Sequence, residues 1–404
     1  MPNHEENPRI PDLKTLAVWA GEEEKNLWKG STQVPVVHSV SYGYQDLDHW
    51  YDVAVGKAEG HIYSRNTNPT VAVFEEKMRQ LEGGEAATSF STGMAAVSNT
   101  LYALLKPGDR VVSVKDTYGG TNEIFTRFLP RLNVDVTLCE TTDHEQIEAE
   151  VAKGCQVLYL ETPTNPTLKV IDIRRLTAAG KAVGAVVVVD NTFATPINTN
   201  PLSLGCDLVL HSATKFLGGH ADALGGVVCG SKTLVEKIFR YREINGATLH
   251  PMAAYLHIRG LKTLALRVER QNENALTLAR WLKEQPFVSD VYYPGLESHA
   301  GHEIARNQMR GYGGVLSFFL QGDFDSVRTF LPLLRYAHVA ANLGPVETVA
   351  GPPRTTSHVE VTPGQRAAMG IPETLIRYSV GIEDVEDLKA DLNQALVKTA
   401  ERAP

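Results

Sequence analysis

The alternation of hydrophobic and polar positions changes along the chain near residue 60. Before that point Pro, Gly, polar and aromatic residues are mixed without a clear period, which predicts an extended arm with one short helix near Leu13–Trp28. An arm that builds no core of its own usually lies on another surface, often that of a second subunit. Beyond residue 70, helical spacing predicts helices over Val71–Leu81 and Met94–Leu105, the second opened by Ser91-Thr92-Gly93.

Short apolar runs then alternate with helical stretches. The runs are Arg110–Val114, Val134–Leu138, Val157–Leu160, Ala185–Val189 and Leu208–Leu210. Four successive valines at 186–189 would make a poor exposed helix and a good central strand, because β-branched side chains pack well in a buried sheet. Alternating short buried strands and helices predict a mostly parallel sheet with helices on both faces.

The rhythm shifts after residue 258. A long helix is predicted over Leu261–Lys283, followed by apolar runs at Val288–Tyr293 and Val315–Phe319 and a helical C-terminus over Val385–Thr399. A chain of 404 residues exceeds one core of ordinary size. We therefore expect an N-terminal arm over residues 1–62, a large domain over 63–258 and a small α/β domain over 259–404.

Composition narrows the class of protein. Hydrophobic residues make up 43% of the chain and charged residues 21%, as in soluble globular proteins. The net charge is −8 without a Lys/Arg block, so a nucleic-acid partner is not expected, and no apolar run approaches the length that spans a membrane. The N-terminus lacks a signal-peptide pattern, and four cysteines without a C-x-x-C pair are expected to be free buried thiols in a reducing cytoplasm. The 13 histidines show no metal-ligand spacing, so no metal site is expected.

Two strand ends carry candidate chemistry. Asp190 follows the four valines, and ligands of open α/β sheets lie beyond the carboxyl ends of the strands, although an Asp there also serves as a helix cap. The next predicted strand runs into Ser212-Ala213-Thr214-Lys215. A lone lysine in such a loop is usually solvated. Two hydroxyls beside it suit a phosphate, and an amine held where its pKa is lowered becomes a nucleophile toward an aldehyde.

Three further segments carry groups that suit an anionic ligand. Ser91-Thr92-Gly93-Met94 places small residues at a helix start, where backbone N–H groups favour an anion, although an ordinary N-cap has the same pattern. Tyr63 and Arg65 project to the same side of an extended segment and together would grip a phosphate, whereas alone they belong to a turn before a helix. Arg377 interrupts a strand-like run, which favours either a substrate carboxylate or a structural ion pair.

Taken together, the motifs resemble those of the Cys/Met-metabolism family of pyridoxal-phosphate enzymes. In order they are Tyr63-Ser64-Arg65 with Asn68-Pro69-Thr70, Ser91-Thr92-Gly93-Met94, Asp116-Thr117-Tyr118-Gly119-Gly120-Thr121, Glu161-Thr162-Pro163-Thr164-Asn165-Pro166, Val189-Asp190-Asn191-Thr192, Ser212-Ala213-Thr214-Lys215 and Arg377-Tyr378-Ser379-Val380-Gly381. The resemblance covers about residues 30 to 395. It implies an α/β fold of the fold type I pyridoxal-phosphate transferases, with a mostly parallel seven-stranded sheet in the large domain.

The resemblance also implies roles for individual residues. Lys215 matches the Schiff-base lysine, Asp190 the partner of the pyridinium nitrogen, and Tyr118 the ring that stacks on the cofactor and protonates the leaving group. Arg377 matches the substrate carboxylate clamp, and Asn165 a residue near the cofactor's 3′-oxygen. The matches to the phosphate-binding residues are Gly93, Met94, Ser212 and Thr214, with Tyr63 and Arg65 contributed by a neighbouring subunit. A homotetramer built from two catalytic dimers is therefore implied.

Ile62 and Ala341 bear on the substrate. Cystathionine enzymes of this family commonly have a glutamate at each of these positions, before Tyr-Ser-Arg and before the segment that reads Asn342-Leu343-Gly344-Pro345 here. An apolar pair suits the S-methyl group of methionine better than a distal ammonium group. The predicted activity is therefore that of a methionine γ-lyase, with Asn342, Leu343 and Tyr63 as further substrate contacts.

Other positions keep alternatives open. Gly120 stands where methionine γ-lyases have a cysteine and is similar to the cystathionine enzymes, which favours a cystathionine γ-lyase. Asn342 is similar to the homoserine-ester sulfhydrylases, and γ-replacement by a sulfhydrylase or a cystathionine γ-synthase is the third alternative. Pro345 removes a backbone donor from the loop that normally contacts the substrate carboxylate. A cofactor-binding sensor and a nicotinamide oxidoreductase are weaker rivals, because the chain shows neither a basic helix-turn-helix pattern nor a G-x-G-x-x-G after its first strand.

Overall fold

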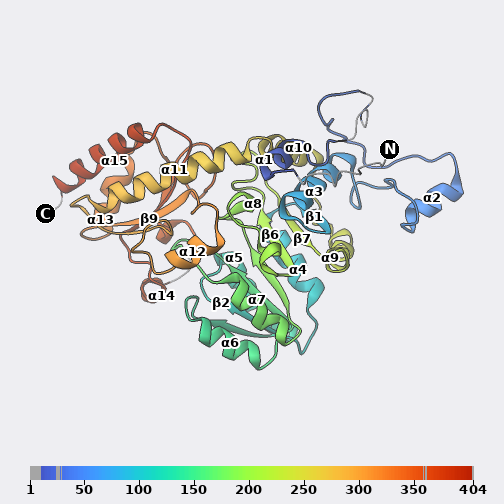
Figure 1. Ribbon diagram of the computed structural model, residues 1–404, viewed down its shortest axis with the longest axis horizontal. Coiled ribbons are helices and arrows are strands. Elements are labelled where there is room, and N and C mark those ends of the chain that lie inside the picture. The colour runs from blue at the N-terminus through green and yellow to red at the C-terminus, as the bar shows by residue number, and fades with distance from the viewer. Residues whose placement is uncertain (1–10, 24–27, 29, 358, 360–361, 403–404) are drawn as a thin grey trace, which may run out of the picture.

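The computed structural model describes residues 11–23, 28, 30–357, 359 and 362–402. The arm holds two helices, α1 at Leu13–Trp19 and α2 at Leu47–Ala54, and α2 lies at the far end of an extension that projects from the body of the molecule (Figure 1). The predicted helix near Leu13–Trp28 is wrong in length, because α1 stops at Trp19 and the left-handed Gly21 follows. Residues 24–27 of that prediction lie outside the described residues. Helix α2 was not predicted, and none of its residues is buried.

A seven-stranded sheet forms the centre of the molecule, in the order β1-β7-β6-β5-β4-β2-β3. Only β7 runs antiparallel to its neighbours, which confirms the mostly parallel sheet and the α/β class. The strands are β1 Ala86–Phe90, β2 Arg110–Val114, β3 Asp135–Cys139, β4 Val157–Glu161, β5 Val186–Asp190, β6 Leu208–Ser212 and β7 Gly226–Gly230. The sequence pattern predicted neither β1, which contains Thr88 and Ser89, nor β7, which is bounded by glycines.

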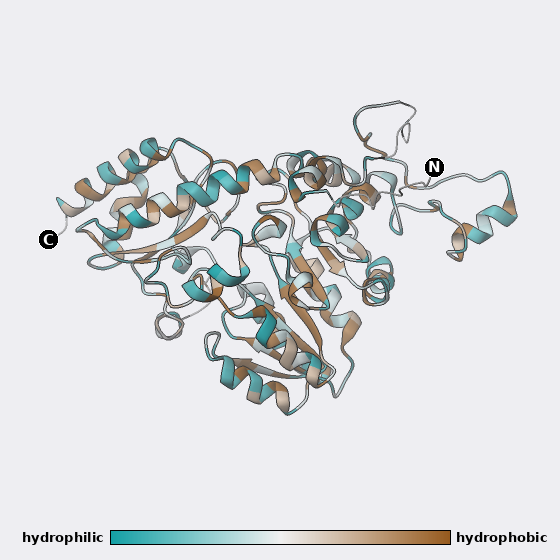
Figure 2. Ribbon diagram, viewed as in Figure 1, coloured by the Kyte–Doolittle hydropathy of each residue, from teal (hydrophilic) through white to brown (hydrophobic). Residues whose placement is uncertain are grey.

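Helices cover both faces of this sheet, and the strands between them are the most hydrophobic part of the molecule (Figure 2). On one face Val188 packs with α4 and α9, and on the other Val187 and Val189 pack with α6 and α7. This alternation is the period of two that an extended strand imposes. The helices are α3 Pro69–Glu82, α4 Gly93–Leu104, α5 Gly119–Glu123, α6 His144–Ala152, α7 Ile173–Ala182, α8 Thr195–Asn198, α9 Lys232–Asn245 and α10 Pro251–Leu261, with a π-helical turn at Ile124–Phe128.

A second sheet of five strands lies toward the end of the molecule opposite the arm, in the order β10-β11-β12-β9-β8 (Figure 1). Its strands are β8 Val288–Tyr292, β9 Val315–Leu320, β10 His338–Val339, β11 Val349–Gly351 and β12 Leu375–Ser379. Its helices are α11 Leu264–Lys283, α12 His302–Gln308, α13 Phe324–Phe330, α14 Pro363–Ala368 and α15 Val385–Ala400. The predicted helix over Leu261–Lys283 begins too early, because Leu261 ends α10 and α11 starts only at Leu264.

The two sheets lie on either side of α10 along the chain, and residue 258 falls within that helix. The division into residues 1–62, 63–258 and 259–404 stays a prediction. All four cysteines are free, with Cys155 only partly buried. None of the helices in the described ranges is long and apolar enough to cross a membrane.

The core of the second sheet offers a test of packing. Phe318 on β9 is fully buried and makes edge-on contacts with Phe330 and Tyr378, with ring centroids 5.8 Å and 6.3 Å away. Replacing a buried phenylalanine by alanine removes apolar burial and leaves a cavity. We expect Phe318→Ala to lower the free energy of unfolding by about 3–5 kcal/mol, measured by urea titration. Phe128→Ala, at a ring that is 48% exposed, is the control, and equal losses in the two variants would contradict this packing.

Candidate active site

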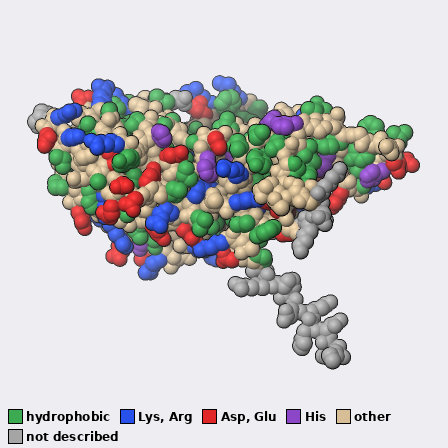
Figure 3. Space-filling view, turned by 90° about the horizontal axis from the view of Figure 1, so that it is seen from above, with side chains coloured by type: hydrophobic (Ala, Val, Ile, Leu, Met, Phe, Trp, Pro, Cys, Tyr) green, Lys and Arg blue, Asp and Glu red, His purple; other side chains and the backbone are tan. Residues whose placement is uncertain are grey.

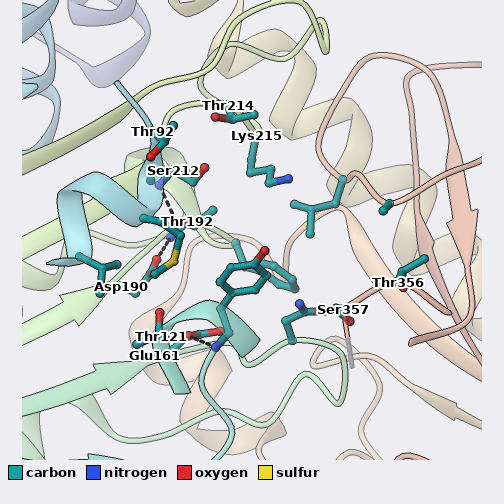
Figure 4. A pocket seen from close by; sticks show the side chains of 18 of the residues that line it. Thr92, Thr121, Glu161, Asp190, Thr192, Ser212, Thr214, Lys215, Thr356 and Ser357 are labelled. Carbon is teal, nitrogen blue, oxygen red and sulfur yellow. Dashed lines mark hydrogen bonds between the residues drawn. The ribbon is translucent and has the colours of Figure 1, made fainter. Parts of the chain in front are cut away.

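A cavity of about 260 Å³ opens at the carboxyl ends of β4, β5 and β6. Because these strands are parallel, Glu161, Asp190 and Ser212 emerge at one edge of the sheet. The structure brings most of the predicted site residues together here, although they come from segments far apart in the sequence (Figure 4). Those that line the cavity are Gly93, Met94, Tyr118, Asn165, Asp190, Ser212, Thr214, Lys215, Ala341, Leu343 and Arg377.

Lys215 reaches into the cavity from the loop that follows β6 (Figure 4). Its amine donates a hydrogen bond to Oδ1 of Asn342 at 2.9 Å. Burial, aided by the positive charge of Arg377, lowers the pKa of Lys215 to about 8. A substantial share of this amine is therefore neutral near physiological pH, as a nucleophile toward an aldehyde requires.

The start of α4 approaches the end of β6 closely. A Cβ atom at Gly93 would lie 2.6 Å from Cβ of Ser212, and one at Gly226 would lie 2.2 Å from the carbonyl oxygen of Thr92, so glycine is required at both positions. Thr92 caps α4 by accepting a hydrogen bond from the Ala95 N–H at 3.0 Å. The remaining first-turn N–H groups of a helix have no partner within the helix, and together with the hydroxyls of Ser212 and Thr214 they form a cradle suited to a phosphate.

Two carboxyl groups end neighbouring strands. Asp190 accepts hydrogen bonds from the Thr192 N–H at 3.0 Å and the Tyr159 hydroxyl at 3.4 Å, and burial raises its pKa. Glu161 accepts the Tyr118 N–H at 2.8 Å, and burial together with Asp190 raises its pKa well above the usual value. Sequence reasoning assigned no role to Glu161, although its place at a strand end matches that of Asp190.

Arg377 on β12 is 5% exposed and faces the cavity. Its guanidinium donates to Oδ1 of Asn165 at 3.0 Å and to the backbone oxygen of Asn342 at 2.9 Å. Burial lowers its pKa to about 10. Within the described ranges no carboxylate forms an ion pair with Arg377, so both hydrogen bonds go to neutral oxygens. A buried guanidinium of this kind retains its affinity for a bidentate carboxylate.

Four predicted site residues do not line the cavity. Tyr63 and Arg65 lie on the arm side with exposed side chains, where Arg65 sits over the Tyr63 ring at 5.6 Å and donates to the backbone oxygen of Glu243. Ile62 also lies outside the lining. Asn342 is absent from the lining as well, yet it contacts both Lys215 and Arg377.

Sequence reasoning missed several lining residues. They are Thr92, Val97, Thr121, Glu161, Pro163, Thr192, Phe193, Leu224, Thr356 and Ser357. Thr92, Thr121, Glu161, Pro163 and Thr192 lie within the motifs that carry the family resemblance, which was a usable signal. Thr356 and Ser357 come from the loop after β11, and no local pattern marks them as neighbours of the cavity.

The residues fit pyridoxal phosphate. Lys215 supplies an amine of lowered pKa for its aldehyde, the start of α4 with Ser212 and Thr214 supplies donors for its phosphate, and Asp190 supplies a carboxylate without a protein cation for its ring nitrogen. In the described part of the chain no group of three or more His, Cys, Asp or Glu side chains is placed to hold a metal ion. The fold and the site therefore define a pyridoxal-phosphate enzyme of fold type I.

Comparison with known proteins agrees. Residues 14–397 match the family described as Cys/Met metabolism PLP-dependent enzyme, and the chain belongs to this family. It is 41% identical to an L-methionine gamma-lyase of Fusobacterium nucleatum subsp. polymorphum over 96% of this chain and 98% of that protein. It is 40% identical to a cystathionine gamma-lyase of Bacillus subtilis, over 95% and 98% of the two chains.

Solved structures show the same relationship. The cystathionine gamma synthase of Xanthomonas oryzae pv. oryzae, in complex with cystathionine, superposes with a TM-score of 0.92 at 36% identity, over 98% of this chain and 100% of that chain. The chain is thus a pyridoxal-phosphate-dependent enzyme. This finding argues against the two other predicted classes, the cofactor-binding sensor and the nicotinamide oxidoreductase. Its relatives of similar identity carry different activities in their names, so family membership alone does not select among them.

The lowered pKa of Lys215 has a measurable consequence. In protein freed of cofactor, we expect the rate of imine formation with added pyridoxal phosphate to rise with pH through a midpoint of about 8, since the neutral amine is the reactive form. Arg377→Gln removes a cation that disfavours the charged amine, so the midpoint should move to higher pH. The measurement is the visible absorbance of the bound cofactor over time, with Arg306→Gln as the control. A solvated lysine amine has a pKa of about 10.4. A wild-type midpoint near that pH would contradict the prediction.

Proposed function

We propose that this enzyme catalyses γ-elimination on a sulfur amino acid, with L-methionine as the substrate. The products are methanethiol, 2-oxobutanoate and ammonia, with one water consumed. The observation that carries the proposal is the apolar wall that Ala341 and Leu343 contribute to the cavity beside Lys215. Such a wall suits a methyl thioether, whereas the distal ammonium of cystathionine would be left without a partner.

The roles proposed for the chain's own groups follow from their positions. Pyridoxal phosphate, when bound, supplies the electron sink that makes the Cα proton of an amino acid acidic. Lys215 would hold the cofactor covalently until the amine of the substrate takes its place. The freed lysine amine would then remove the Cα proton, pass it to the cofactor and remove a Cβ proton. Arg377 binds the substrate carboxylate and Asp190 keeps the ring nitrogen protonated. Tyr118 covers the cofactor ring and gives a proton to the departing thiolate.

Two observations favour alternative activities of the same site. A Cβ atom at Gly120 would lie 2.8 Å from Sδ of Met94 and 3.1 Å from the Tyr118 ring, so a side chain here would crowd both residues. A glycine at this position is similar to the cystathionine γ-lyases. Asn342, which accepts a hydrogen bond from Lys215, is similar to the residue that the homoserine-ester sulfhydrylases have at this position; in those enzymes a thiol captures the intermediate, as it does in cystathionine γ-synthases. The backbone oxygen of Asn342 accepts a hydrogen bond from Arg377, so the loop that contains Pro345 remains beside the proposed carboxylate site.

The decisive assay compares two substrates on the cofactor-loaded enzyme. We expect 2-oxobutanoate to be released faster from L-methionine, together with methanethiol, than from L-cystathionine. Lys215→Ala should abolish release from both, because the lysine carries the cofactor and the protons, while Lys232→Ala on the exposed side of α9 should not. Faster release from cystathionine would favour the γ-lyase alternative, and little release from either would favour γ-replacement, tested with homoserine esters and a thiol.

The two apolar positions give a second prediction. Ile62→Glu combined with Ala341→Glu should raise kcat/KM for cystathionine relative to methionine by about tenfold or more, because one paired carboxylate is worth about 1.4 kcal/mol or more in a partly enclosed site. The matched control is Ile62→Gln with Ala341→Gln, which changes size without adding charge. An unchanged ratio in the glutamate variant would show that these positions do not set the preference.

We propose further that the active enzyme is a homotetramer made of two catalytic dimers. Tyr63 and Arg65 are placed outside the cavity of their own chain, which suits a contribution to a neighbouring one. The arm also exposes large apolar side chains, with Leu47 at 70% and Tyr51 at 62%, and hydrophobic side chains recur on the surface toward the end that carries the arm (Figure 3). Exposed apolar surface of this kind is typical of protein contacts. A cytoplasmic location fits the four free thiols.

Arg65 tests this arrangement. We expect Arg65→Ala to weaken pyridoxal-phosphate binding by about tenfold or more, because a charge-assisted contact with a phosphate is worth about 1.5–3 kcal/mol. The measurement is the dissociation constant of the cofactor, with Arg240→Ala on the exposed face of α9 as the control. Mixing Arg65→Ala chains with Lys215→Ala chains should restore partial activity, since each cavity would then draw on both chains. Unchanged affinity in Arg65→Ala would contradict the phosphate role.

A further inference from the structure

Glu161 and Asp190 form a pair of carboxyl groups in one cavity. Glu161 ends β4, Asp190 ends β5, and the two are Cα partners in the parallel register. Residues in register on neighbouring parallel strands project to the same face of a sheet, and both side chains line the cavity. Glu161 is 6% exposed, and Asp190 is partly buried.

The pair lacks a protein cation. The hydrogen bonds to Asp190 come from Thr192 and Tyr159, and those to Glu161 come from the backbone of Tyr118 and of Asn165. Across the residues that the structure describes, neither carboxyl forms an ion pair with Lys, Arg or His. Two adjacent carboxylates in an enclosed site without a counterion cannot both stay ionised at low cost, so the pair retains one proton.

The surroundings decide which member holds that proton. Asp190 is stabilised as a carboxylate by hydrogen bonds from Thr192 and Tyr159, and these contacts oppose the burial that raises its pKa. For Glu161, burial, Asp190 and Asp116 raise the pKa well above its usual value, although the backbone N–H groups of Tyr118 and Asn165 oppose this shift. The charge of Asp116 is itself paired with Lys169, with Nζ at 2.8 Å, and burial keeps the Tyr159 hydroxyl neutral by raising its pKa. Because Asp190 accepts hydrogen bonds from both Thr192 and the Tyr159 hydroxyl, the surroundings favour the negative charge on Asp190 and the proton on Glu161.

The geometry also connects Glu161 with Tyr118. Tyr118 occupies the N-cap position of α5, where no side-chain cap supports it, and its ring is 45% exposed at the cavity. The hydrogen bond from its N–H to Oε2 of Glu161 is the contact that ties this segment to the end of β4. A shift of that carboxyl group would move the backbone from which the tyrosine ring projects.

We propose that Glu161 is a positioning residue, which as a neutral carboxylic acid anchors the backbone of Tyr118 and leaves Asp190 as the single negative charge beside the cofactor ring. This inference rests on the proposed placement of the ring nitrogen at Asp190 and of the Tyr118 ring over the cofactor. It gives Glu161 two consequences. The Tyr118 ring keeps its orientation over the cofactor. The cofactor's ring nitrogen lies beside one carboxylate, that of Asp190, and no second negative charge competes for the proton on that nitrogen.

Infrared spectroscopy of the holoenzyme tests the protonation state. At neutral pH the wild-type protein should show the C=O stretching band of a protonated carboxyl group, and Glu161→Gln should lose it. Glu303→Gln, at a carboxylate that is 67% exposed and paired with Arg306, should leave the band unchanged. A spectrum without such a band, or a band that survives Glu161→Gln, would overturn the proposal.

A pair of variants tests the positioning role. Glutamine keeps an acceptor for the Tyr118 N–H and carries no charge, so Glu161→Gln should retain the visible circular dichroism of the bound cofactor and kcat within about threefold. Leucine fills a similar volume without an acceptor, so Glu161→Leu should alter the dichroism and lower kcat about tenfold or more, while cofactor content and melting temperature stay close to wild type. Equal damage in both variants would show that the charge of Glu161 matters, and no damage in Glu161→Leu would show that it positions nothing; either result would overturn the inference.

These outcomes can be separated from those of the proposed function. Both spectroscopic measurements require only the bound cofactor and no turnover of a sulfur amino acid. If neither methionine nor cystathionine releases 2-oxobutanoate while the infrared and dichroism results are as expected, the proposed γ-elimination fails and the role of Glu161 stands.

Discussion

The parallel register of β4, β5 and β6 is the constraint on which the site depends. Parallel strands end at the same edge of a sheet, so residues that are 29 positions apart in the sequence, Glu161 and Asp190, become direct neighbours there. Ser212 ends the next strand, and Lys215 follows it within three residues. The start of α4 then reaches this edge because Gly93 has no side chain to keep it away from Ser212.

The ionisable groups gathered at this edge form no ion pairs with one another. Lys215 is partly buried and Arg377 is buried, and both donate hydrogen bonds only to neutral oxygens, while Glu161 and Asp190 accept hydrogen bonds only from uncharged donors. Each of these four groups costs stability when it is desolvated without a partner of opposite charge. A bound ligand with a protonated ring nitrogen and a carboxylate would give Asp190 and Arg377 the partners that the protein does not supply, which is the usual way in which an active site uses stability for binding and catalysis.

The second sheet contributes the residues that are proposed to contact the substrate. Arg377 comes from β12, while Ala341, Asn342 and Leu343 come from the segment between β10 and β11. The lysine, the cradle and the aspartate come from the first sheet. Relatives with similar overall identity are named as a methionine lyase and a cystathionine lyase. This is the pattern expected when the residues that promote the shared chemistry are kept and only the wall around the distal part of the substrate differs.

Local pattern alone determined much of this protein. The strand at Arg110–Val114 was predicted to the residue, and the four-valine strand and the helix after Ser91-Thr92-Gly93 were predicted to within a residue or two, because the period of side-chain burial and the chemistry of helix starts are local properties. The order of short motifs was enough to indicate the family and its cofactor. The weak strands β1 and β7 escaped notice, since Ala, Ser and Gly carry little strand signal until neighbouring strands bury them.

Only the tertiary structure decided the contacts between distant segments. It placed Asn342 against Lys215, 127 positions away, and Glu161 beneath the backbone of Tyr118, and it put Tyr63 and Arg65 outside the cavity of their own chain. No period in the sequence encodes such distances, because they follow from how two sheets and an arm pack together. The sequence therefore determined which chemical groups the site contains, and the packing of the folded chain decided which of them touch and which remain without a partner of opposite charge.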